Sequence, residues 1–273
     1  MTGIASARWL GCQRIELAEC GSTNDEAARL ARAGARHGTI VVADAQRAGR
    51  GREGRVWASP IGGLSLSAVV RPPLPLPDVP PMTLAIGIGV CDAVRETGAP
   101  GVLKWPNDLL VTRRKLAGVL VEAQSQGTRL DAVIVGIGVN LGGELAETVD
   151  RTAPPFGGAE GRAQVPTLGA TAITLAEAAG TTIERAAFLE RLLAHVEHWI
   201  DRYVAVGLDS IIAAWQDRMA PGLAARATVD GAPLTGEVAG LDRDGALLLR
   251  DREGRVHRVR SGDVEVIRAT TMS

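Results

Sequence analysis

The first part of the chain alternates between a helical spacing of apolar residues and short runs that are apolar almost throughout. The stretch STNDEAARLARAG at 22–34 has the helical spacing: Thr23 and Glu26 are spaced as in a capping box, and Gly34 ends the run. TIVVADA at 39–45 and LSLSAVV at 64–70 are typical of strands. The pattern therefore predicts a helix followed by two strands, with an arginine-rich and glycine-rich loop between the strands.

The middle of the chain predicts one buried helix and three further strands. Residues 82–97, MTLAIGIGVCDAVRET, are apolar on nearly every side, which favours a buried helix although Gly87 and Gly89 weaken it. Strands are predicted around VLKWP, across KLAGVLVEAQ and in DAVIVGIGV. Residues 142–165, rich in Gly, Pro and Ala, predict a loop. Helical patterns then occupy three ranges: 167–179, 182–206 and 208–219.

After Pro221 the pattern changes to short alternating runs separated by Asp and Gly turns, among them ARATVD, TGEVAGLD, GALLLRD and VHRVRSGDVEVIR. This texture predicts a small β-barrel. The mixed order of helices and strands before it predicts an α+β fold, with a mixed sheet and flanking helices. We therefore expect two domains, residues 1–219 and residues 220–273.

Composition limits the class of protein. The 273 residues are 46% apolar, enough for a sizeable core, and the formal net charge of −1 gives no overall basic field for nucleic acid or anionic membranes. Cys12, Cys20 and Cys91 have neither metal-site nor disulfide spacing, as is typical of a reducing compartment. The chain has no leader pattern and no run of eighteen apolar residues. We expect a soluble, cytoplasmic protein.

The loop GRGREGRVW at 49–57 fits G-x-G-x-x-G, the fingerprint of dinucleotide-binding folds. That fold needs a helix starting at the last glycine, whereas Pro60, Gly62 and Gly63 follow here before another strand. We therefore reject a dinucleotide site, and no P-loop pattern is present either. The glycines allow close backbone approach, and the arginines offer permanently charged donors for phosphate or carboxylate. Taken alone, the loop is equally well explained as a solvated segment.

Two further stretches carry candidate chemistry. In KWPNDLL, Pro106 biases the preceding residue toward extended geometry, so Asn107 and Asp108 fall at a turn where they can point into a cleft. In RRKLAGVLVE, Lys115 enters a strand beside small residues and can point its charge at a ligand. Taken alone, KWPNDLL would be an ordinary turn, and Lys115 would be a solvated lysine.

Together, STN, GRGREGRVW, KWPND, KLAGVLVE and GIGVNL occur in an order and spacing that resembles the biotin protein ligases, strongly over residues 15–142. The C-terminal β texture is similar, more loosely, to the SH3-like domain of that family. The resemblance implies that biotin's carboxylate attacks the α-phosphate of ATP, giving biotinyl-5'-AMP and pyrophosphate. A lysine amine of a carrier protein then attacks this mixed anhydride. Fixed positive charge and Mg²⁺ would offset the repulsion between the carboxylate and the triphosphate.

The resemblance also implies roles for individual residues. Lys115 would be the principal catalytic lysine, and Arg50 and Arg52 would contact the biotin carboxylate and the phosphates. Asp108 would orient the carrier lysine or help to accept its proton, and Trp57 would stack on adenine. The remaining implied residues bind biotin, the adenylate or pyrophosphate: Ser22, Thr23, Asn24, Gln46, Gly49, Gly51, Arg55, Asn107, Gly118 and Asn140.

ATP and biotin are thus the expected substrates, with Mg²⁺ as cofactor and the biotin carboxyl carrier domain of a carboxylase as partner. Only 20 residues precede GSTN, too few for a helix-turn-helix head, so we expect a monofunctional enzyme that does not bind an operator. We expect the arginine loop to be mobile until the intermediate forms. Dimerisation stays open, and the four histidines, His37, His195, His198 and His257, suggest no metal cluster.

Two rival functions remain at this point. A lipoate or octanoate ligase has a related catalytic fold but an arginine-led loop with a run of three glycines, which is missing here. A nucleic-acid-binding module could use the arginine loop and the basic RVHRVR segment at 255–260. The slightly acidic chain with only 3% aromatic residues argues against that module, because no stacking platform accompanies the arginines.

Overall fold

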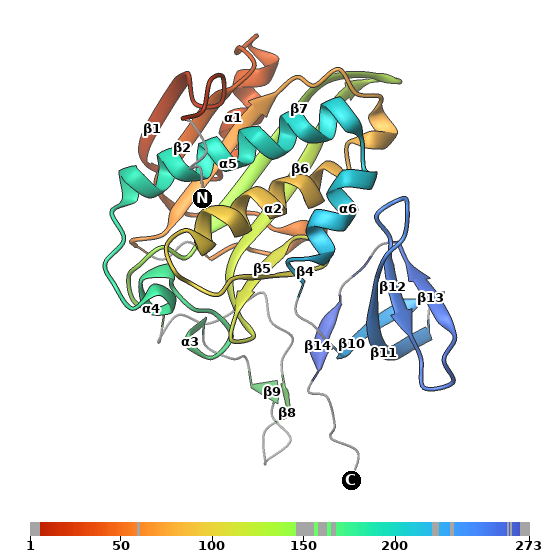
Figure 1. Ribbon diagram of the computed structural model, residues 1–273. Helices are drawn as coiled ribbons and strands as arrows, with labels where there is room; N and C mark the ends of the chain where they lie inside the picture. Colours follow the sequence, from red (N-terminus) through yellow and green to blue (C-terminus); the bar gives the residue numbers. More distant parts are fainter. Residues whose placement is uncertain are drawn as a thin grey trace.

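The computed structural model describes residues 6–58, 61–145, 156–157, 163–164, 168–219, 224–229, 232–260, 262 and 264–267. Two sheets organise this part of the chain (Figure 1). The larger sheet has seven strands in the order β1-β2-β3-β7-β6-β5-β4, of which β1 and β2 are parallel and all other neighbours antiparallel. A mixed α+β fold with flanking helices is therefore confirmed.

The strands of the larger sheet are β1 (Gln13–Cys20), β2 (Thr39–Gln46), β3 (Leu64–Val70), β4 (Val102–Lys104), β5 (Asp108–Val111), β6 (Arg114–Gln126) and β7 (Arg129–Val139). The helices are α1 (Thr23–Arg32), α2 (Met82–Arg95), α3 (Leu168–Thr171), α4 (Leu175–Ala179), α5 (Arg185–Val206) and α6 (Asp209–Gln216), with 3₁₀ turns η1 (Arg52–Gly54) and η2 (Leu76–Asp78). Most of the predicted elements are thus present within a few residues of their predicted bounds.

Alternation along the strands builds an apolar layer on each face of the sheet. On β7, Val133, Val135 and Ile137 join the main core under α2 and α5. Ala132 and Ile134, which point the other way, pack with Ala27 of α1. In Figure 1, α2 and α5 lie side by side across one face, with α6 next to them.

Gly89 of α2, predicted to weaken that helix, allows α5 to pack closely against it. A Cβ at this position would lie 2.8 Å from the Cα of Val196 on α5. The close approach explains why a residue of poor helix propensity stands in a largely buried helix. The prediction of a buried helix over 82–97 is confirmed, except that the helix ends at Arg95.

Three local predictions differ from the structure. Strand β1 was not predicted, although Ile15 and Leu17 alternate with polar residues; it is a largely exposed edge strand, so its pattern is faint. Strand β5, beginning at the predicted turn residue Asp108, was also missed. The predicted helix over 167–179 is split into α3 and α4 because Ile173 leaves the helix to donate its N–H to the carbonyl of Lys115.

The predicted loop over 142–165 lies largely outside the described residues. Within it, β8 (Phe156–Gly157) and β9 (Ala163–Gln164) pair antiparallel. In the described part of the chain, no helix combines the length and the apolar character needed to cross a membrane.

The C-terminal sheet has five antiparallel strands in the order β13-β12-β11-β10-β14. They are β10 (Ala224–Val229), β11 (Ala232–Leu241), β12 (Leu247–Arg250), β13 (Val256–Val259) and β14 (Glu265–Ile267). Hydrogen bonds tie the sheet to the rest of the chain: the Trp105 indole donates to the carbonyl of Gly245, and the Leu241 N–H donates to the side chain of Gln216. The sheet is therefore held beside α6 and the β4–β5 turn (Figure 1).

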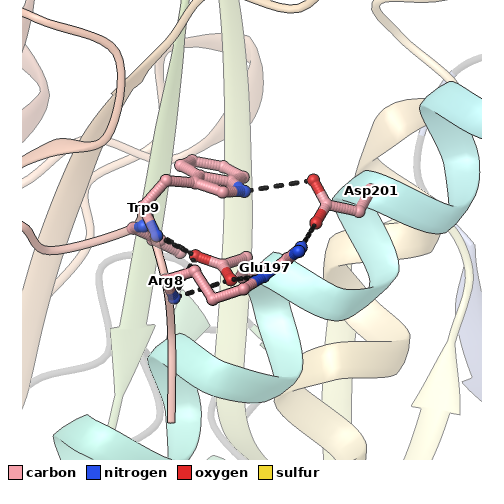
Figure 2. A network of polar contacts seen from close by, with 5 residues as sticks. Arg8, Trp9, Glu197 and Asp201 are labelled. Carbon is pink, nitrogen blue, oxygen red and sulfur yellow. Dashed lines mark hydrogen bonds and ion pairs between the residues drawn. The ribbon is translucent and has the colours of Figure 1, made fainter. Parts of the chain in front are cut away.

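A buried carboxylate fastens the N-terminal segment to α5 (Figure 2). Glu197 accepts hydrogen bonds from the backbone N–H groups of Arg8, Trp9 and Leu10 at 2.7–3.0 Å. Asp201, one turn further along the helix, accepts from the Trp9 indole and pairs with the Arg8 guanidinium. Burial raises the pKa of the Glu197 carboxyl, but the three backbone donors outweigh it and hold this pKa below its usual range.

Candidate active site

A cavity of about 420 Å³ opens between the large sheet and the C-terminal sheet. Its walls come from the start of α1, the arginine loop, the β4–β5 turn and the glycine-bearing middles of β6 and β7. Arg226 and Thr228 of β10 close the far side. The predicted site residues that line it are Ser22, Thr23, Asn24, Gln46, Arg50, Gly51, Arg52, Arg55, Trp57, Asn107, Asp108, Lys115 and Gly118.

One end of the cavity carries uncharged hydrogen-bonding groups. Gln46 Oε1 accepts from the backbone N–H of Thr23 at 2.8 Å and lies 3.1 Å from its hydroxyl, while Gln46 Nε2 donates to Ser65 Oγ at 3.1 Å. Ser22 and Asn24 are buried beside them at the first turn of α1. Hydroxyl and amide groups fixed in this way can recognise a small, uncharged polar ring.

The arginine loop is a tight hairpin rather than the start of a helix. The Trp57 N–H donates to the Gly49 carbonyl at 2.8 Å, and the Gly51 N–H donates to the Arg55 carbonyl at 2.7 Å. A Cβ on Gly49 would lie 2.4 Å from the carbonyl oxygen of Trp57, so only glycine fits there. The chain reverses at Glu53 and Gly54, which have positive φ of 56° and 76°. Because only a three-residue 3₁₀ turn forms, the loop lacks the geometry of a dinucleotide fingerprint, as predicted.

Arg50 and Arg52 contact residues outside the loop, whereas Arg55 pairs with Glu53 inside it at 3.5 Å. Arg50 forms ion pairs with Asp25 at 2.9 Å and with Glu122 at 2.8 Å. The Arg52 guanidinium lies 3.4 Å from the side-chain oxygen of Asn107. Asn107 in turn donates to the Val119 carbonyl at 2.9 Å, which links the loop to β6.

Two lysines hold one carboxylate at the β4–β5 turn. Lys115 Nζ lies 2.7 Å from Asp108 Oδ1, and Lys104 Nζ lies 3.0 Å from Asp108 Oδ2. Burial raises the pKa of the Asp108 carboxyl, but the charges and hydrogen bonds of Lys115 and Lys104 outweigh it and lower this pKa to about 2. Such a carboxylate is a weak base, so its charge state supports an orienting role over accepting a proton.

Lys104 was missed as a candidate by the sequence reasoning, although it opens the KWPND motif. Its place on β4, paired in register with Asp108 on β5, brings a second ammonium to the same carboxylate. Among the described residues, and including Lys104 and Arg226, six cationic side chains and one carboxylate line the cavity, a formal excess of five positive charges. This end of the cavity is therefore suited to a polyanion.

Trp57 lies across two glycines of the sheet. A Cβ on Gly138 would lie 2.4–2.7 Å from the indole, and one on Gly118 would lie 3.3 Å from it. Lys115 Nζ lies 5.3 Å from the centroid of the same ring. The two glycines thus permit the close approach and leave room for a flat indole in the cavity wall.

Gly49 and Asn140 are the predicted site residues that do not line the cavity. Asn140 is buried, and its side-chain amide donates to the backbone carbonyl of Lys115 at 3.1 Å. In this structure the Asn140 side chain therefore contacts the backbone that carries Lys115. Within the described ranges, no three His, Cys, Asp or Glu side chains are grouped to hold a metal ion.

Comparison with known proteins agrees with this geometry. Residues 20–140 match the biotin/lipoate A/B protein ligase family, and residues 226–266 match the biotin protein ligase C-terminal domain. The chain is 34% identical over 248 residues to a bifunctional ligase/repressor of Bacillus subtilis, covering 90% of this chain and 71% of that protein. It is 33% identical over 246 residues to a biotin--[acetyl-CoA-carboxylase] ligase of Paracoccus denitrificans, and the match covers 88% of this chain and 95% of that protein.

A solved structure of the biotin protein ligase from Aquifex aeolicus, in complex with biotin and ATP, superimposes with a TM-score of 0.71 at 28% identity. The match covers 94% of this chain and all of that one. The fold and the cavity therefore define a catalytic domain of the biotin/lipoate ligase class. With the second matched domain and the two relatives, this chain belongs to the biotin protein ligase family. The resemblance inferred from the motifs is confirmed.

Proposed function

We propose that this chain activates biotin with ATP to biotinyl-5'-AMP and then transfers biotin to a lysine of the biotin carboxyl carrier domain of a carboxylase. The observation that carries the proposal is that one cavity joins an uncharged hydrogen-bonding end to a strongly cationic end. The two substrates have matching chemistry, because biotin has a neutral ureido ring and a carboxylate, and ATP is a polyanion. The cavity holds both in one place, which converts their encounter into a unimolecular step.

The biotin ring fits the uncharged end. Ser22, Thr23, Asn24 and Gln46 supply its hydroxyl and amide groups. The Gln46 amide is held in place because it accepts from the Thr23 N–H and donates to the Ser65 hydroxyl. Leu66 and Ile137 provide apolar walls beside them. The biotin carboxylate would then extend toward the arginine loop.

The carboxylate and the α-phosphate would meet where the cations gather. Lys115 and Arg52 would stabilise the negative charge that develops between the carboxylate and the α-phosphate. The loop backbone from Gly49 onward, which carries Arg50, would close over the intermediate. Arg55, which also lines the cavity, would contact the pyrophosphate. Removing one such fixed donor typically costs roughly 10²- to 10³-fold in rate.

Trp57, with Gly118 beside it, would receive the adenine, and Asn107, which lines the same cavity, would contact the adenylate. The Trp57 ring lies on the glycines of β6 and β7 and lines the cavity. Mg²⁺ would arrive as MgATP: in the part of the chain that the structure describes, Asp108 is the only carboxylate that lines the cavity, and both its oxygens already contact lysines. An ion held by phosphates and water, with at most one protein carboxylate, is usual for magnesium.

In the second half-reaction a lysine amine of the carrier attacks the mixed anhydride. Asp108, held ionised by Lys104 and Lys115, would orient that amine rather than take its proton. Release of AMP completes the transfer. That the protein acts on this carrier stays a proposal.

The same proposal includes the domain boundary and the type of the C-terminal domain. We assign residues 1–219 to the catalytic domain and residues 220–273 to a barrel of the SH3-like type. Strands β10 and β13 are not neighbours in the sheet order, yet they contact each other, and this contact supports a barrel. We expect a cytoplasmic enzyme that does not bind an operator, which a gel shift at physiological salt tests. A sizing measurement tests whether the protein forms a homodimer.

The test is to mix the protein with ATP, Mg²⁺ and either biotin or lipoate, and to follow the acyl-adenylate by mass spectrometry together with pyrophosphate release. A biotin-only product is expected. A lipoate product would move the chain to the other branch of the matched family. No product with either acid would refute the activity.

A further inference from the structure

A chain of polar contacts starts at the uncharged end of the cavity and leads to the arginine loop. Ser67 Oγ lies 2.8 Å from Thr23 Oγ1 and 2.5 Å from Asn24 Oδ1. Asn24 has little freedom to move, because a Cβ on Gly136 beneath it would lie only 2.2 Å from its Oδ1. The side-chain amide of Asn24 is therefore fixed from one side by the sheet and by Ser67.

The other side of the Asn24 amide is held by Glu122 of β6. Asn24 Nδ2 donates to Glu122 Oε2 at 2.6 Å, and the Arg50 guanidinium donates to the same oxygen at 2.8 Å. These residues are far apart in sequence: the residue numbers of Asn24 and Glu122 differ by 98, and those of Arg50 and Glu122 by 72. One carboxylate oxygen thus joins the floor of the uncharged end to the arginine loop.

Glu122 does not itself line the cavity, so it acts on a ligand only through its two partners. The hydrogen bond to Arg50 is charge-assisted, and Arg50 lies in the hairpin beside Val56, where its position sets that of the loop backbone. Asp25, the second partner of Arg50, is 60% exposed, whereas the Glu122 side chain is 34% exposed. Solvent therefore screens the contact with Asp25 more strongly.

We propose that Glu122 is a positioning residue that couples occupation of the uncharged end of the cavity to closure of the arginine loop. A biotin ring bound beside Asn24 holds that amide in place, the amide holds the Glu122 carboxylate, and the carboxylate holds Arg50 with the loop closed. Closure in turn slows the escape of biotin, since the coupling between two sites is reciprocal. This inference rests on the proposed function.

The experiment uses trypsin, because the loop contains Arg50, Arg52 and Arg55 as cleavage sites. Cleavage of the full-length protein within the loop is followed by mass spectrometry as biotin is titrated, and the KM values for biotin and for ATP are measured in adenylate formation. In Glu122→Ala, the biotin concentration for half-protection and the KM for biotin should both rise roughly tenfold, the loss of one charge-assisted contact. The KM for ATP should rise less than the KM for biotin, because Arg52 and Lys115 still line the cationic end of the cavity. A general loss of folding would not separate the two KM values in this way.

Two further variants separate the coupling from simple loss of charge or of fold. Glu122→Gln keeps an acceptor oxygen but loses the charge, so its half-protection concentration should fall between those of the wild type and Glu122→Ala. Asp25→Asn removes the exposed partner of Arg50 and leaves the contact with Asn24, so it should behave like the wild type. If Glu122→Ala is unstable, the comparison of Glu122→Gln with Asp25→Asn decides the question alone.

Wild-type protection and KM values in both Glu122 variants would overturn the inference, as would an equal effect of Asp25→Asn. Failure of the proposed function looks different: the wild type would then form no biotinyl adenylate and gain no protection from biotin. The two failures are therefore distinguished by the wild-type protein alone.

Discussion

Asp108 offers the sharpest test of how charge is arranged in the cavity. The Asp108→Asn variant keeps the size of the side chain and removes the negative charge between Lys104 and Lys115. In the wild type, these two lysines bring the pKa of this carboxyl from 3.8 to about 2. At 1.36 kcal/mol per pKa unit, the shift corresponds to about 2 kcal/mol of folding free energy. No large discount for solvent applies, since the side chain is only 13% exposed.

The pH dependence of this contribution has a definite sign. Because the folded-state pKa is lowered, the stabilisation is fully present above 3.8 and is lost as the pH falls from 3.8 toward 2, where the native carboxyl also becomes protonated. Asn cannot titrate. The difference between wild type and Asp108→Asn should therefore be about 2 kcal/mol at pH 7 and pH 5, and should shrink as the pH falls below 3.8.

Urea unfolding followed by tryptophan fluorescence measures this difference at each pH. Asp44→Asn is the matched control, because Asp44 pairs with Arg185 at 2.9 Å but is 67% exposed, and such pairs contribute roughly 0 to 1 kcal/mol. A loss at pH 7 no larger than that of the control, or a difference that does not change below pH 3.8, would refute the reasoning.

Four other outcomes follow from the structure. Lys115→Ala should slow adenylate formation roughly 10²- to 10³-fold while lowering the melting temperature little; wild-type pyrophosphate release in this variant would remove Lys115 from the chemistry. Gly138→Ala should raise the KM for ATP about as much as Trp57→Ala, roughly tenfold, because the added Cβ displaces the indole; an unchanged KM in both would mean that adenine does not stack there. Biotin with ATP should protect the arginine loop from proteolysis, and equal cleavage with and without ligand would count against loop closure. Glu197→Ala should lower the free energy of unfolding by roughly 2 to 4 kcal/mol, because three backbone N–H groups lose their acceptor, and urea unfolding that detects no loss would contradict the anchoring role.

For strands β3 and β1, the success of the sequence prediction followed how strongly burial marked the pattern of apolar residues. Strand β3 was predicted with its correct bounds because every residue in it is buried. Edge strand β1 carries its apolar residues only at alternate, half-exposed positions and was missed. The break between α3 and α4 has a different origin, since the backbone of Ile173 bonds to Lys115, a partner distant in the chain. No local pattern records such a partner.

The sequence by itself determined the residue types and the local turns of this protein. The glycines and the Glu53–Gly54 reversal close the arginine loop through contacts within nine residues, so GRGREGRVW specifies its own hairpin. The motif order also sufficed to predict the family, which the comparisons confirm.

Only the tertiary structure decided which of these groups meet. Lys104, Asp108 and Lys115 converge because β4, β5 and β6 pair in one register, and Asn24, Glu122 and Arg50 converge because α1 and the loop lie against the same strand. Register and packing are set by contacts across the whole core, whereas residue type and turn geometry are set within a few residues of the chain.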